Sequence, residues 1–244
     1  MALFFAFGIT ESRVLGFMGL SRLLVTYIQL AMAIMPIFIL LTTVRSVAGD
    51  REAGVFEYLL ALPIGLGDWS GGRLLGRFLV VFSPVFLAMA GAAGWATIQG
   101  IEVPWKMFGV YTGLLAAMSW CFLGLGMFVS SVARSTDVAQ GAAFIVWLGC
   151  LLFLDLILLG VMIQGRVSPD LVVGLALLNP LQVFRTGALM LFDPQLVVFG
   201  PAAYVIYDWF GGAKFLIYAL TYPVALGTLA AWLGFRSFRR GDLV

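Results

Sequence analysis

Long apolar runs separated by short clusters of charge dominate the chain, and five of them are long enough to cross a bilayer as helices. They lie at about residues 23–44, 78–98, 107–130, 138–163 and 214–235. A spanning helix needs about 20 mostly apolar residues. Residues 1–9, MALFFAFGI, are apolar but too short, and they lack the basic flank and cleavage site of a signal peptide. We expect this stretch to be the end of a truncated first span, with the start codon assigned late or the first helix missing.

The segment 164–213 differs from an ordinary loop, because it alternates charged residues with apolar runs. Pro180 cannot continue a helix that begins at Leu171, whereas Asn179 followed by Pro180 suits an N-cap and a first helical position. We therefore predict a new helix from Pro180 to the Asp193-Pro194 break, with short helices that enter the outer leaflet. A further tilted span around 186–207 is the alternative.

Composition points to the same class of protein. Of the 244 residues, 62% are hydrophobic and 11% are charged, whereas about a quarter of the residues of soluble domains are charged. Such a chain needs a bilayer to cover its surface, and it has room for roughly six spans. The absence of Pro-rich or Gly/Ser-rich linkers predicts a single transmembrane domain over residues 1–244.

The charges also predict an orientation. Three connections alternate sides with the rest, namely residues 45–77, the turn at Arg134 and the C-terminal tail. Placing them inside puts eight of the 14 Lys and Arg residues there, with the higher density of basic residues. The C-terminus is therefore predicted to be cytoplasmic. The small net charge of +2 gives no reason to expect nucleic acid as a partner.

Intrinsic catalysis is not expected. The chain has no histidine, no Cys-x-x-Cys, no nucleophile elbow and no phosphate loop. We predict no catalytic residue, no metal site and no cofactor bound by this chain. If the protein uses ATP, a separate subunit must hydrolyse it.

The connection over residues 49–78, called here the elbow, is the most informative stretch. It is predicted to form two short helices around a turn, with Glu52 and Glu57 early in the first, Pro63 ending it and Asp68 capping the second. Such a charged elbow could bind a soluble partner and transmit its conformational change to the two spans that it joins. Alternatively, its charges only solvate a loop and anchor it at the lipid headgroups.

The order of residues in the elbow resembles the coupling-helix region of ABC type-2 permeases. The resemblance rests on an acidic residue, Gly54, the run Glu57–Leu60, the run Leu62–Ile64 and a basic stretch that ends near Arg77. It implies the six-span ABC type-2 permease fold, here with its first span incomplete and with short outer re-entrant helices. It also implies contact with an ATPase through a short helix around Leu62 to Trp69. The residues expected to serve this coupling are Glu52, Glu57, Leu62, Pro63, Asp68 and Trp69.

A narrower resemblance is to the NosY-type permeases of nitrous oxide reductase maturation systems. It rests on Leu154-Asp155-Leu156, Leu178-Asn179-Pro180 and Phe184-Arg185. It implies a homodimer in the bacterial inner membrane with two cytoplasmic ATPases (NosF-like), which hold ATP and magnesium, and a periplasmic β-helical partner (NosD-like). The expected task is assembly of a copper-sulfur centre. Asp155, Asn179 and Arg185 are the expected transmembrane or partner-facing residues.

Asp155 is the one ionisable residue that lies well inside a predicted span. A carboxylate there costs about 2.5–3.5 kcal/mol at the helix centre. It could form an ion pair with a residue such as Arg185, remain protonated and bonded to a neighbouring helix, or be a satisfied structural group. Because ion-coupled carriers usually hold several such groups, an ion-driven transporter is a weaker alternative than a general ABC exporter of lipid or drug.

Overall fold

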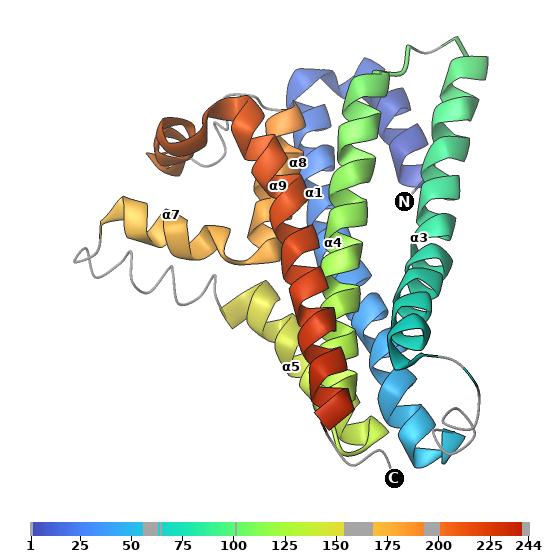
Figure 1. The fold of residues 1–244 in the computed structure, drawn as a ribbon. Helices are drawn as coiled ribbons and strands as arrows, with labels where there is room; N and C mark the ends of the chain where they lie inside the picture. The colour runs from blue at the N-terminus through green and yellow to red at the C-terminus, as the bar shows by residue number, and fades with distance from the viewer. Residues whose placement is uncertain are drawn as a thin grey trace.

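The computed structural model describes residues 2–55, 63, 65–100, 102–153, 168–192 and 201–240, and within these ranges the side chains from Thr26 onward except those at 153, 169, 201–203 and 240. These residues form helices and turns, with no strand among them. In chain order the helices are α1 (Ala2–Glu52), α3 (Leu66–Ile98), α4 (Trp105–Val132), α5 (Thr136–Leu148), the π-helix η1 (Gly149–Phe153), α7 (Pro169–Leu177), α8 (Pro180–Phe192) and α9 (Pro201–Arg240). Figure 1 shows them as a bundle of long helices with α7 projecting from one side.

Among the described residues, four helices are long and apolar enough to cross a membrane: Thr26–Glu52, Leu66–Ile98, Trp105–Val132 and Tyr204–Arg239. They contain the predicted segments 23–44, 78–98, 107–130 and 214–235 almost entirely. Helix α5 with η1 begins the predicted segment 138–163, whose remainder lies outside the described residues. The all-α membrane fold predicted from the apolar runs is confirmed.

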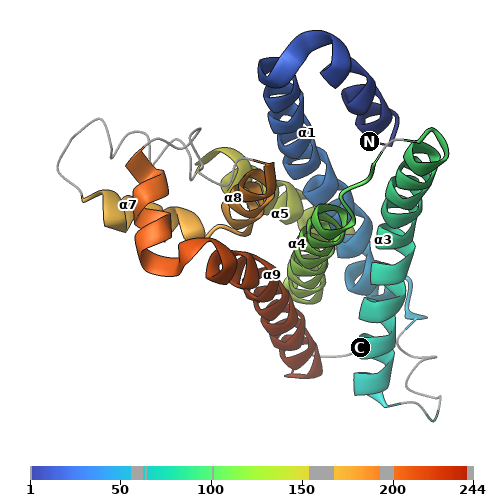
Figure 2. The ribbon, with the colours of Figure 1, turned by 90° about the horizontal axis from the view of Figure 1, so that it is seen from above.

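The N-terminal stretch is helical. Helix α1 is continuous from Ala2, and Figures 1 and 2 show its beginning, in the darkest blue, arching over before the span descends. Helix therefore joins the apolar stretch 1–9 to the predicted span that begins at about residue 23. That residues 1–9 end a truncated span stays a prediction.

Helix α4 forms the centre of the bundle, and the view from above shows the other spans around it (Figure 2). Its side chains at Leu114, Met118 and Phe122 are fully buried in the main core. Helix α3 lies at the periphery, and its Leu79, Val80 and Leu87 are 65%, 72% and 66% exposed. Apolar side chains on the outside of a spanning helix can face lipid. The exposed apolar face of α3 is therefore suited to contact the hydrocarbon of the bilayer.

Glycines bring α4 and α9 into backbone contact. A Cβ atom added at Gly124 would lie 2.0 Å from the carbonyl oxygen of Gly227, and one at Gly234 would lie 2.8 Å from the Cα of Phe128. Small residues let helices approach closely in lipid, where packing rather than the hydrophobic effect holds helices together. Helices α4 and α9 therefore pack with their backbones in contact at Gly124 and Gly234.

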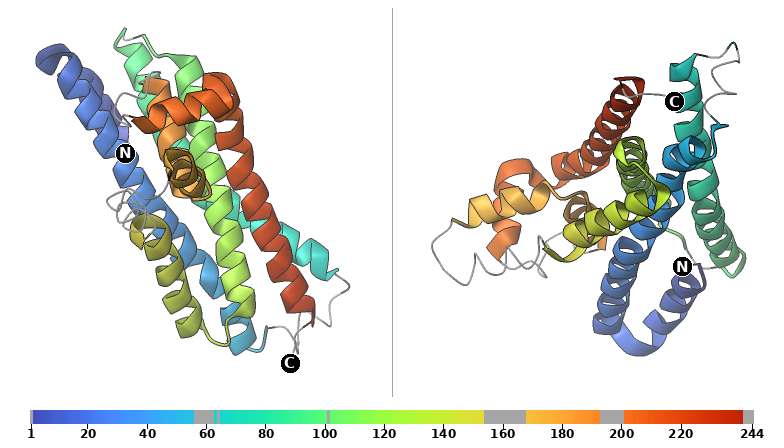
Figure 3. Two further views of the ribbon diagram at one scale, coloured as in Figure 1. Left: turned by 90° about the vertical axis from the view of Figure 1, so that its left-hand side faces the viewer. Right: turned by 90° about the horizontal axis from the view of Figure 1, so that it is seen from below.

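The predicted break at Asn179-Pro180 is present. Helices α7 and α8 meet at a bend of 102°, and Figure 3 shows α7 lying across the direction of the spans. Helix α8 begins at Pro180 and runs to Phe192, as predicted, and it is almost wholly buried. Within residues 168–192, which the structure describes, two short helices therefore follow one another, and the second is inserted into the core.

Candidate functional site

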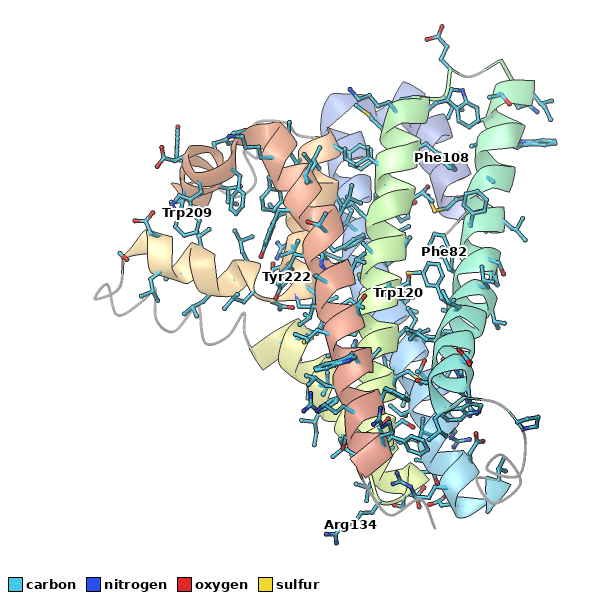
Figure 4. The ribbon with its side chains drawn as sticks, in the orientation of Figure 1. Phe82, Phe108, Trp120, Arg134, Trp209 and Tyr222 are labelled. Carbon is cyan, nitrogen blue, oxygen red and sulfur yellow. The ribbon has the colours of Figure 1, made fainter. Side chains whose placement is uncertain are left out.

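The three connections predicted to share one side of the membrane do lie at the same end of the bundle. Helix α1 ends, α3 begins, α4 turns into α5 at residues 133–135, and α9 ends there (Figure 1). Figure 4 shows Arg134 at the tip of this end, pointing away from the bundle. We call it the elbow end.

A small apolar cluster joins four helices at the elbow end. Val47, Met127 and Phe238 are buried in it, and Leu66, Trp69 and Leu74 of α3 pack against them. The Trp69 ring stacks on Phe238 with centroids 5.7 Å apart, and the guanidinium of Arg73 lies 5.0 Å from the Trp69 centroid. The start of α3 is thereby attached to the end of α9.

Charged residues of α3 bind α1 directly. Arg73 forms an ion pair with Asp50, and Arg77 donates to the carbonyl oxygen of Thr42 at 2.7 Å. Hydrogen bonds to charged groups are stronger than neutral ones. The sequence suggested that these charged residues lie in a solvated connection. In the structure, Arg73 and Arg77 instead join α3 to α1.

Helix α1 is also fastened to α4 and α5. Ser130 Oγ accepts from the backbone N–H groups of Val47 and Ala48 at 2.9 and 3.0 Å. Arg51 donates to the carbonyl oxygens of Ser131 and Ala133, and the Glu52 carboxylate accepts from Thr136. The end of α1 is consequently bonded to both sides of the turn between α4 and α5.

The structure corrects the predicted helices of the elbow. Glu52 is the last residue of the long α1 and does not open a short helix of its own, and its carboxylate accepts from Thr136 of α5. Asp68 is exposed in the first turn of α3, whose N-cap is Gly65, so it does not cap that helix. The segment from Leu66 to Phe78 belongs to the long α3 span. Pro63 is exposed at a bend, and Glu57 and Leu62 lie outside the described residues.

A second group of polar contacts holds the bend between α7 and α8. Asn179 Oδ1 accepts from Leu181 N–H at 3.0 Å, which confirms the predicted cap, and its Nδ2 donates to the Cys150 carbonyl oxygen at 2.6 Å. That carbonyl belongs to η1, and π-helices often occur at functional sites. Asn179 thus ties α8 to the end of α5.

Two tyrosines of α9 complete this group. Tyr218 donates to the Leu177 carbonyl oxygen at 2.9 Å, and Tyr222 donates to that of Leu178 at 2.5 Å; Figure 4 shows Tyr222 directed toward this region. These carbonyls end α7, where no helical partner exists. Sequence reasoning missed both tyrosines, although their spacing of four places them on one helix face.

The remaining predicted residues are placed as follows. Arg185 is half-buried on α8, and its role toward a partner or a subunit interface stays a prediction. Asp155 lies outside the described residues. Within the described part of the chain, no three His, Cys, Asp or Glu residues come together as a metal site.

The helical spans, the broken helix and the bonded elbow end define a multi-spanning α-helical membrane domain, and the comparison with known proteins gives its family. The family model described as ABC-2 family transporter protein matches residues 12–243. The chain therefore belongs to the ABC-2 transporter family, and it is a permease subunit that works with an ABC ATPase.

Two relatives narrow the resemblance. The probable ABC transporter permease protein NosY of Stutzerimonas stutzeri is 28% identical over 234 residues, which cover 87% of this chain and 84% of that protein. The protein of the same description from Pseudomonas aeruginosa is 30% identical over 193 residues, which cover 77% of this chain and 70% of that protein. Their similarity extends over most of the chain, so it does not depend on one motif.

Proposed function

We propose that this chain has the NosY-type role, in which a permease couples cytoplasmic ATP hydrolysis to a periplasmic partner that serves assembly of the copper-sulfur centre of nitrous oxide reductase. The two NosY relatives and the motifs around Asp155, Asn179 and Arg185 support this task. The complex holds two copies of the chain, two NosF-like ATPases and a NosD-like β-helical protein. ATP and magnesium bind the ATPases, and this chain is not catalytic.

The observation that carries the proposal is the construction of the elbow end. The connection after Glu52 is flanked by α1 and α3, and both are bonded to the rest of the bundle within a few residues of it. An ATPase that moves the connection therefore acts on helices that are already joined. In this arrangement the elbow end and the C-terminus face the cytoplasm, where the basic residues concentrate.

Trp69 has a different task from the one that its sequence position suggested. Its ring packs on Phe238, so it links α3 to α9 and leaves the exposed contact with the ATPase to residues nearer Pro63. Glu57 is the residue of the connection whose charge we expect to matter for docking. Its reversal should weaken association with the ATPase, because charges at a contact steer and select partners.

The test is complementation. The chain is produced, together with a NosF-like ATPase and a NosD-like periplasmic protein, in a denitrifying bacterium that lacks its own NosY-type permease. We expect nitrous oxide consumption and the visible absorption of the copper-sulfur centre to return, and Glu57→Lys to abolish both while Arg134→Gln, at an exposed position of the same end, does not.

Two results would contradict different parts of the proposal. If the chain inserts and the ATPase co-purifies, yet the enzyme lacks its copper-sulfur centre, the NosY-type task is wrong and a general exporter of lipid or drug is favoured. If Glu57→Lys leaves co-purification and ATPase stimulation unchanged, docking through the connection is wrong.

A further inference from the structure

The last two residues of α1 bind the ends of two different helices. Arg51 donates through Nη1 to the Ala133 carbonyl oxygen at 3.0 Å and through Nη2 to the Ser131 carbonyl oxygen at 3.3 Å. Helix α4 ends at Val132, and the last four carbonyl groups of a helix lack an intrahelical donor. Arg51 therefore supplies donors to the C-terminal end of α4 from outside that helix.

Glu52 does the converse for α5. Its carboxylate accepts from the Thr136 backbone N–H at 2.9 Å and from the Thr136 hydroxyl at 2.8 Å. Thr136 is the first residue of α5, so its N–H is one of the four without an intrahelical acceptor. The local N-cap, Ser135, accepts from Val138 N–H and leaves this donor to Glu52.

The two charges match the helix ends that they bind. A cation is favoured at a helix C-terminus and an anion at an N-terminus, each by about 0.3–1 kcal/mol at an exposed position. Arg51 meets the first kind of end and Glu52 the second. An exchange of the two residues would place each charge against the end that repels it, without a change in net charge.

A third contact lies less than two turns earlier in α1. Ser130 Oγ accepts from the N–H groups of Val47 and Ala48 and donates to the Val44 carbonyl oxygen at 2.5 Å. The hydroxyl thus binds both donors and an acceptor of the α1 backbone. Residues 44–52 of α1 and 130–136 of α4 and α5 consequently share bonds along their length.

We infer that Arg51 and Glu52 are positioning residues that transmit movement of the connection between α1 and α3 to α4 and α5. This inference rests on the proposed coupling to an ATPase. The chain turns immediately after the pair, at Gly54 with φ +66°, so on the α1 side of the connection a force reaches Arg51 and Glu52 first. From α5 the movement continues through η1, where the Cys150 carbonyl oxygen binds Asn179 at the bend between α7 and α8.

The experiment exchanges the pair, with Arg51→Glu and Glu52→Arg in one chain, in the complete complex with its ATPase. Spin labels at Glu102 and Asp170, both exposed and both outside the elbow end, report the distance between the α3–α4 loop and α7. Cys121 and Cys150 are first replaced by alanine so that only these positions are labelled. Distances are measured with and without ATP and magnesium.

In the unexchanged pair we expect an ATP-dependent change in this distance. In the exchanged pair we expect the ATPase to co-purify as before and the distance change to be lost. Glu52→Gln should keep the change, because its amide can still accept from Thr136 N–H and bond the hydroxyl, whereas Glu52→Ala should lose it. Arg134→Gln, a charge change in the same turn, should keep it.

This comparison separates transmission from mere stability, because Glu52→Gln and Glu52→Ala are required to differ in the ATP response at equal complex yield. An exchanged pair that retains the full distance change would overturn the inference, as would an unexchanged complex without any ATP-dependent change. Failure of the ATPase to bind the unexchanged chain would instead overturn the proposed function. If the exchanged chain does not assemble, the two Glu52 variants alone decide the inference.

Discussion

Replacement of Gly124 by alanine changes one atom at the place where α4 and α9 touch backbone to backbone. The new Cβ would lie 2.0 Å from the carbonyl oxygen of Gly227, 2.5 Å from its carbonyl carbon and 2.7 Å from its Cα. All three are backbone atoms, so no rotamer change can relieve the overlap. Ordinary contact begins at 3.4 Å, so the helices would have to separate locally by about 1.4 Å, the difference between 3.4 and 2.0 Å.

The energetic cost follows from that separation. Overpacking of a well-packed core costs about 1–3 kcal/mol, and a radial gap of about 0.5–1 Å already removes a quarter to a half of the dispersion energy of the atoms that it separates. Because a separation of about 1.4 Å exceeds that gap, we take the upper end of the overpacking cost, about 3 kcal/mol, for the new methyl group. Alanine gains about 1 kcal/mol over glycine as a helix former. We expect a net destabilisation of about 2 kcal/mol.

The measurement is unfolding of the purified chain in mixed micelles as the fraction of denaturing detergent increases. Gly91→Ala on α3 is the matched control, because its Cβ would meet nothing within 4 Å; it should be neutral or slightly stabilising. Gly227→Ala, whose Cβ would lie 2.7 Å from the Cα of Cys121, should resemble Gly124→Ala. Equal unfolding midpoints for Gly124→Ala and the wild type would refute the backbone contact.

Two further predictions concern the bend between α7 and α8, and both use the same unfolding assay. Asn179→Ala leaves the Leu181 N–H and the Cys150 carbonyl oxygen without these partners, so we expect a loss of about 1–3 kcal/mol; a variant as stable as the wild type would show that neither bond matters. Tyr222→Phe removes only the donor to Leu178 and should cost about 1 kcal/mol. The control, Tyr204→Phe at an 80% exposed position, should cost nothing measurable.

The spans could be predicted because they depend on local information. Apolar length alone located them, and an Asn-Pro pair located the start of α8, since a cap bonds to a residue two positions away. The same reasoning failed in the elbow. There Glu52 bonds to Thr136, 84 positions further along the chain, and Asp50 pairs with Arg73. Charged residues that follow an apolar run suggest a solvated connection, and no local pattern reveals that α5 and α3 occupy them.

The contacts of the tyrosines were hidden for the same reason. Tyr218 and Tyr222 lie 41 and 44 positions from the carbonyl groups that they bind. In an apolar helix their spacing is equally compatible with packing or with a position at the lipid interface. Only the 102° bend, which leaves carbonyl groups of α7 exposed to α9, gives their hydroxyl groups a partner.

The distribution of hydrogen bonds also indicates which helices are free to shift. Several polar side chains within the spans bond to their own helix, as Thr112 does to the Phe108 carbonyl oxygen, and such bonds resist no movement between helices. Hydrogen bonds between helices are most numerous at the elbow end, where α1, α3, α4 and α5 take part, and at the α7–α8 bend, where η1, α7, α8 and α9 take part. Elsewhere, Trp120 donates to Thr228 of α9, and Trp147 donates to the Ala33 carbonyl oxygen of α1. In the body of the membrane α3 meets α4 through aromatic rings, with Phe78 and Trp120 5.3 Å apart and Phe82 beside them (Figure 4). Ring contacts tolerate sliding better than buried hydrogen bonds tolerate rupture. At the elbow end α3 is fastened to α1 and α9 by Arg73, Arg77 and Trp69, so we expect ATP-driven movement to carry α1 and α3 together there and to displace α3 against α4 only farther along the span.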